Sequence, residues 1–207
     1  MNLNKIYTDL LLIIGFQNQE IQQNWNVLEK AYSKKSRHYH NLTHLEEMIT
    51  SFEMYRNRLQ NPNEILFSIF YHDIVYSASK KDNELKSAEF ALSVLSEKHL
   101  LNKQLVFNAI CATQQHAYNT NEDINWLIDF DLKILAKDWN DYKIYFEQIR
   151  TEYRIYPDFL YKPGRAKALK HFLEYEFIFQ TEEFRNLYED LARRNIEKEI
   201  SYLESKK

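Results

Sequence analysis

Histidine and aspartate residues occur along this chain in an order that could bind a divalent metal ion. His40 and His44 stand four residues apart, His72 and Asp73 are adjacent, and Asp131 follows much later. Imidazole nitrogen and carboxylate oxygen are ligands that zinc, manganese and iron accept in proteins. Such an ion activates water near neutral pH and polarises a phosphoryl oxygen. These residue types therefore indicate hydrolytic metal chemistry, provided that the fold brings them together.

The pair His72 and Asp73 lies in a segment that we predict to be a buried helix. Apolar residues cover nearly every side of the helix expected from Pro62 to about Val75, so protein should surround it. A carboxylate removed from water without a partner is driven to neutralise, and buried charges are normally paired or bound to metal. Taken alone, the pair fits a His–Asp hydrogen bond at a helix end as well as it fits a metal site.

The two earlier histidines lie where another helix is expected to start. Asn41 or Thr43 can accept a hydrogen bond from the first free backbone N–H groups of this helix. If the helix reaches back to His40, then His40 and His44 share one of its faces.

Glycine and proline are scarce, with two glycines and three prolines in 207 residues. Sheets and their turns need these residues, whereas helices avoid them, so the composition predicts an all-α protein. The length fits one large domain, and we expect residues 1–207 to form a single helical bundle. Further helices are expected over residues 3–16, 18–32, 83–97 and 103–116, from Asp138 to an end before Pro157, from about Arg165 onward, and over residues 182–203.

The formal net charge of -3 gives no general attraction to nucleic acid or to an acidic membrane surface. We therefore expect neither as a partner, and no segment is long enough to cross a membrane. The single cysteine, Cys111, excludes an intramolecular disulfide framework and fits a reducing compartment. The expected location is the cytoplasm.

The ordered set His44, His72, Asp73 and Asp131 resembles the signature of the HD superfamily of metal-dependent phosphohydrolases. The segment from Tyr39 to His44 is also similar to the Tyr-His-Asn-x-x-His motif of cyclic-nucleotide phosphodiesterases. The resemblance covers roughly residues 20–200, which it implies are the core of an HD-type helical domain. It also implies that these four residues hold one or two divalent ions, drawn from Mn, Zn, Fe, Co or Mg. By the same resemblance, His40 is the general acid that protonates the leaving oxygen.

Asp129 and Asp131 compete for the last ligand position. Two positions apart on a helix, they point about 200° away from each other, so both cannot face one ion. The resemblance favours Asp131, because the final Asp of the family is commonly followed by an apolar or basic turn, here Leu132 and Lys133. We expect Asp129 to lie behind the ligands or at the surface.

Three further residues have both functional and structural interpretations. His116, expected to close its helix, is either a second-metal or phosphate contact or a partner of the helix dipole. By the resemblance, Glu84 orients the attacking water or joins a second metal; its structural interpretation is a cap at a helix start. Arg37, beside the histidine pair, is either the first candidate for phosphate binding, because a guanidinium makes planar two-point contacts with oxyanions, or an exposed arginine.

The expected function is hydrolysis of a small phosphorylated substrate, a phosphomonoester or phosphodiester and possibly a nucleotide, by metal-activated water. One alternative is a metal-stabilised domain that binds or senses a nucleotide without turnover. Another is a di-iron oxygenase, which would require a second ion near His116 and Glu84.

Overall fold

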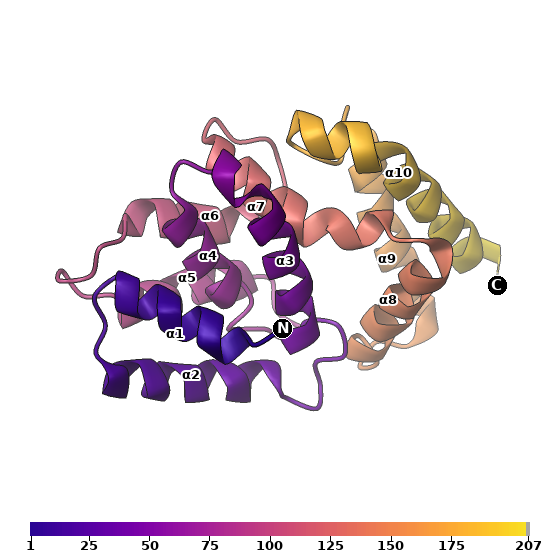
Figure 1. Ribbon diagram of the computed structural model, residues 1–207. Helices are drawn as coiled ribbons and strands as arrows, with labels where there is room; N and C mark the ends of the chain where they lie inside the picture. Colours follow the sequence, from indigo (N-terminus) through magenta and orange to yellow (C-terminus); the bar gives the residue numbers. More distant parts are fainter. Residues whose placement is uncertain (206–207) are drawn as a thin grey trace.

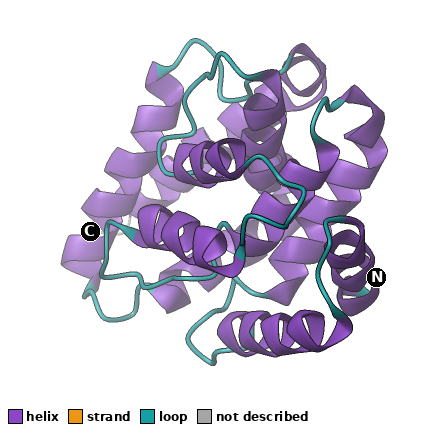
Figure 2. Ribbon diagram, turned by 90° about the vertical axis from the view of Figure 1, so that its left-hand side faces the viewer, coloured by secondary structure: helices purple, strands orange, loops and turns teal. Residues whose placement is uncertain are grey.

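The computed structural model describes residues 1–205, and helices form all of its regular secondary structure. Figure 2 shows helices joined by loops, with no strand in this part of the chain. The predicted all-α class is therefore confirmed. The helices are α1 (Leu3–Ile13), α2 (Asn18–Tyr32), α3 (Leu42–Tyr55), α4 (Pro62–Tyr71), α5 (Asn83–Val94), α6 (Lys103–Ala112), α7 (Glu122–Leu132), α8 (Trp139–Glu152), α9 (Asp158–Glu174) and α10 (Glu182–Ser205), with the 3-10 segments η1 (Arg56–Arg58) and η2 (Lys133–Ala136).

Two groups of helices meet along α7 and its continuation η2 (Figure 1). On one side, α7 packs against α3, α4 and α6. On the other, η2 packs against α8 and α10, and α9 packs on α10. Residues near the end of α7 therefore face both groups.

The start of α3 is set by Asn41, whose side chain accepts a hydrogen bond from the backbone N–H of Thr43. This confirms one of the two predicted caps. The helix begins at Leu42 and does not reach back to His40, so His40 and His44 do not share a helix face. His40 lies in the turn before the helix.

The end of α4 differs from the expected boundary near Val75, because the helix ends at Tyr71. Beyond this end, the carbonyl groups of Asp73 and Ile74 accept hydrogen bonds from the guanidinium of Arg37 at 2.7 and 3.0 Å. Buried carbonyl groups outside a helix need such donors, and here a distant side chain supplies them. These hydrogen bonds stabilise the turn that follows His72.

The start of α9 also differs from expectation, since this helix begins at Asp158 and not near Arg165. Pro163 and Gly164 lie inside it, although proline removes one intrahelical hydrogen bond. Arg150 contacts the carboxylate of Asp158 at 2.7 Å and so fixes the first turn against α8. Three other helices end before their expected boundaries, namely α1, α5 and α6.

Candidate metal centre

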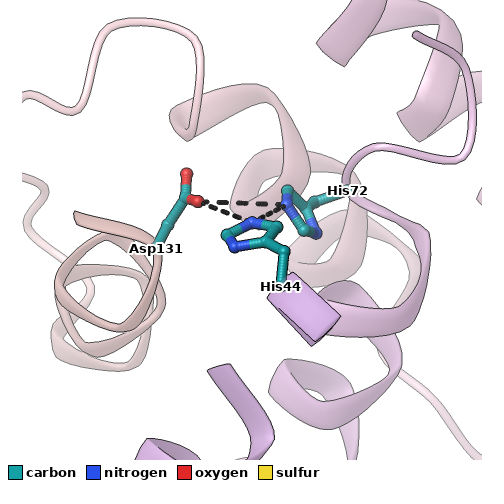
Figure 3. Close-up of side chains that lie close together, drawn as sticks. All are labelled: His44, His72 and Asp131. Carbon is teal, nitrogen blue, oxygen red and sulfur yellow. Dashed lines mark hydrogen bonds and ion pairs between the residues drawn. The ribbon is translucent and has the colours of Figure 1, made fainter. Parts of the chain in front are cut away.

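His44, His72 and Asp131 bring donor atoms together in the core. His44 lies in the first turn of α3, His72 directly follows α4, and Asp131 lies in the last turn of α7. One donor atom from each residue lies within 4.8 Å of the other two. Figure 3 shows the three side chains pointing toward one another from α3, from the end of α4 and from α7. The group could therefore hold a metal ion.

The distances within the group suit a shared ion. His44 Nε2 lies 3.2 Å from His72 Nε2 and 3.1 Å from Asp131 Oδ1. Ligands about 2.0–2.2 Å from one ion, at angles near those of a tetrahedron or octahedron, lie roughly 2.9–3.5 Å apart. The distance between His72 Nε2 and Asp131 Oδ1 is 4.0 Å, so only this pair would need to approach.

The ring of His72 is oriented for metal binding by its other nitrogen. Nδ1 donates to the carbonyl of Ile69 at 2.8 Å, which turns Nε2 toward the group. Burial opposes protonation of His72, but the carboxylates of Asp73 and Asp131 outweigh it and raise its pKa to about 9. The site therefore favours positive charge.

Asp73, the fourth predicted ligand, lies beside this group rather than within it. Its Oδ2 is 3.2 Å from His72 Nε2. Burial would raise the pKa of Asp73, but the charges of His72 and His40 lower it well below its usual range. Asp73 is thus a buried carboxylate that needs a cationic partner.

Asp131 also contacts His116, whose Nε2 lies 3.0 Å from Asp131 Oδ2. Hydrogen bonds with His116 and His44 outweigh the effect of burial and hold the pKa of Asp131 well below its usual range. The expectation that His116 closes its helix is wrong, because α6 ends at Ala112 and the chain then turns. His116 has a φ of 52°, a left-handed conformation that non-glycine residues adopt uncommonly.

Asp129 is neither near the ligands nor at the surface, contrary to expectation. It is fully buried, and its two oxygens accept hydrogen bonds from the backbone of Gln180 and Thr181 and from the Thr181 hydroxyl. Asp129 therefore holds the segment that leads into α10. The preference for Asp131 as the ligand is supported, since Asp129 faces the opposite way.

His40 is paired with Glu152, a residue that the sequence analysis did not identify. His40 Nδ1 lies 2.6 Å from Glu152 Oε2, which also accepts a hydrogen bond from the Tyr76 hydroxyl at 2.7 Å. The other oxygen, Oε1, accepts the backbone N–H groups of His38, Tyr39 and His40. Glu152 therefore fixes both the ring of His40 and the turn that carries it.

This pair favours a protonated imidazole beside the metal group. Burial opposes protonation of His40, but the charge of Asp73 and the hydrogen bond and charge of Glu152 outweigh it and raise its pKa. Burial would raise the pKa of Glu152, yet its contacts with His40 and Tyr76 lower it to about 2. Imidazolium and carboxylate thus stabilise each other.

A cavity of about 420 Å³ connects these groups. His40, His72, Asp73, His116 and Asp131 all lie in its wall. Its further lining includes Glu84, Lys80, Lys81, Tyr76 and Tyr153. Of the predicted site residues, only His44 and Arg37 are not among those that line it.

Two of the remaining candidates can now be placed. Glu84 is half-buried in the cavity wall, where burial raises its pKa. Arg37 is 5 % exposed and donates to backbone carbonyls, so the structure does not support its predicted contact with phosphate. Lys80 and Lys81 also line the cavity and carry positive charge.

No family model, curated protein or solved structure matches this chain. Within residues 1–205, no helix combines the length and the apolar character needed to span a bilayer.

Proposed function

We propose that this protein is a metal-dependent phosphohydrolase that cleaves a small phosphomonoester or phosphodiester. One observation carries the proposal. The residues that could hold an ion and the proton donor His40 belong to one site, because His72, Asp131 and His40 line the same cavity. A buried carboxylate, that of Glu152, holds the ring of His40. Hydrolysis of a phosphate ester needs both an electrophilic centre and a proton donor. The resemblance to HD phosphohydrolases supports the same assignment.

His44, His72 and Asp131 would hold the ion, with Asp73 joining them by a small movement of its side chain. Two imidazoles suit Zn, Mn, Fe or Co better than Mg, which prefers oxygen ligands. A divalent ion at this position would supply an activated water and polarise the phosphoryl group.

The chain's own residues would bind the substrate and move the proton. Lys80 and Lys81 line the cavity and would attract the phosphate. His40, kept protonated by Glu152, would give its Nε2 proton to the leaving oxygen. Glu152 would act as a positioning residue, because it holds the imidazole of His40 and does not line the cavity. Tyr76 donates a hydrogen bond to Glu152 and itself lines the cavity.

The test begins with elemental analysis of the purified protein, followed by assays of metal-reconstituted protein on a panel of phosphate esters. The variant His72→Ala should lose both the metal and the activity. His171→Ala is the matched control, because His171 is exposed on α9 and contacts Glu174. If His72→Ala retains full turnover, the proposal is wrong. Metal binding with no turnover across the panel would favour a domain that binds its ligand without cleaving it.

A further inference from the structure

A second cavity adjoins the first at His40. It has a volume of about 510 Å³, within the range of small-molecule sites, and lies between α8, α9 and residues 78–81. His40, Lys80, Lys81 and Tyr153 line both cavities. His40, the candidate general acid, therefore lies at the boundary between the cavity of about 420 Å³, which we call the metal cavity, and this second space, which we call the tyrosine cavity.

Aromatic and aliphatic side chains form much of the wall of the tyrosine cavity, Lys80 and Lys81 line it where it meets the metal cavity, and no carboxylate lines it. Tyr145, Tyr153, Tyr156 and Tyr161 contribute four phenol rings. Arg165 also lines the cavity, but its charge is neutralised within the fold. Its Nε lies 2.8 Å from Glu199 Oε1, and its guanidinium packs over the ring of Tyr145. The tyrosine rings suit a flat ring on the ligand. Lys80 and Lys81, which also line the metal cavity, would face the phosphate end of the substrate.

We propose that the tyrosine cavity binds the leaving group of the substrate, and that this leaving group is an alcohol carrying an aromatic ring system. This inference rests on the proposed function, because the role of His40 as proton donor determines on which side of the phosphorus the leaving group lies. In the hydrolysis, the water oxygen bonds to phosphorus and the ester P–O bond breaks. The leaving oxygen takes the proton of His40, and the proton released by the water restores it. The group attached to the leaving oxygen thus extends past His40, away from the metal ligands.

If the leaving group binds in the tyrosine cavity, residues of its wall that lie outside the candidate metal ligands determine the preference for that leaving group. Gly164 lines the tyrosine cavity on α9, and a Cβ added there would meet no atom within 4 Å. Ala168 lies one turn further along the same wall. Large side chains at these positions should fill the cavity without disturbing His40.

Binding is measured first, by calorimetry on the metal-loaded full chain with two non-hydrolysable probes, 2-naphthylmethylphosphonate and methylphosphonate. The naphthyl probe should bind roughly 30- to 100-fold more tightly, because its ring leaves water. Gly164→Phe and Ala168→Phe should each remove most of this preference, whereas Gly164→Ala, the matched control, should keep it. Two blocking variants are used because one introduced ring could turn toward solvent. Equal binding of both probes to the wild-type protein, or a preference that survives both blocking variants, overturns the inference.

Turnover of methyl and 2-naphthylmethyl phosphate then separates this inference from the proposed function. Cleavage of both esters at equal kcat/KM would support the phosphohydrolase and contradict the aromatic leaving group. A naphthyl binding preference with no cleavage of either ester would support the tyrosine cavity as a ligand site and contradict the hydrolase. A higher kcat/KM for the naphthyl ester that is lost in Gly164→Phe and Ala168→Phe, but kept in Gly164→Ala, would support both the phosphohydrolase and the aromatic leaving group.

Discussion

Replacing Glu152 by glutamine tests whether the buried carboxylate keeps His40 protonated for catalysis. Glutamine preserves the shape, and its carbonyl oxygen can still accept the backbone N–H groups of His38, Tyr39 and His40. The charge is lost, and an NH2 group would face His40 Nδ1 at the position where Glu152 Oε2 now lies 2.6 Å away. A hydrogen bond to a charged group contributes about 1.5–3 kcal/mol. If the imidazolium is required in the transition state, Glu152→Gln should lower kcat by roughly 10- to 150-fold.

The dependence on the leaving group distinguishes this effect from general damage. An alkyl alcohol needs a proton as it departs, whereas p-nitrophenolate does not. The variant should therefore lose activity on an alkyl phosphate but change by less than about threefold on the p-nitrophenyl ester. The basic limb of its pH–rate profile should also move to lower pH, since the contact with Glu152 helps to raise the pKa of His40.

Metal content and thermal unfolding of the Glu152→Gln variant serve as controls, and the bound metal should be unchanged. Equal losses on both esters would show that Glu152 does not act through proton donation. Unchanged activity on the alkyl ester would refute the assignment of His40 as the proton donor, or the dependence of that proton on Glu152.

Three predictions concern stability, measured by urea unfolding. The pKa of Glu152 is lowered from 4.5 to about 2, so its contribution is present above pH 4.5 and is lost as the pH falls toward 2. The loss should reach about 3 kcal/mol, and a stability curve that is equally steep in Glu152→Gln would contradict it. Asp129→Ala should cost about 2–4 kcal/mol without removing metal, because buried donors of Thr181 lose their acceptor. Glu199→Ala should cost about 3–5 kcal/mol, because Arg165 would remain as an unpaired buried charge, and a neutral outcome would contradict that pairing.

Local sequence signals predicted the fold class and the chemical groups of the site. Few glycines and prolines indicate helices, and Asn41 provides a cap whose position places His44 in the first turn of α3. The apolar surroundings of His72 and Asp73 indicated burial, and both residues are buried. These features depend on neighbours in sequence, which is why they could be recognised without a structure.

Features that depend on distant segments were missed or misinterpreted. Arg37 was expected either to bind phosphate or to be exposed, yet it is buried and donates to carbonyl groups after α4. The signal for Glu152 was present, since it continues the buried stripe formed by Tyr142, Tyr145 and Ile149 on α8. A carboxylate on an apolar stripe requires a partner, but only the fold shows that the partner is the turn at His40.

The balance of charge in the core connects these observations. Glu152 and His40 neutralise each other across a 2.6 Å contact, and so they form a self-contained pair. Asp73 and Asp131 remain, with two negative charges that the protonated ring of His72 offsets only in part. One divalent ion in place of that proton would neutralise both carboxylates and leave neutral imidazoles as ligands. Binding of a divalent cation here would cancel the net negative charge buried in the core. For this reason we expect metal binding and folding to stabilise each other in this protein.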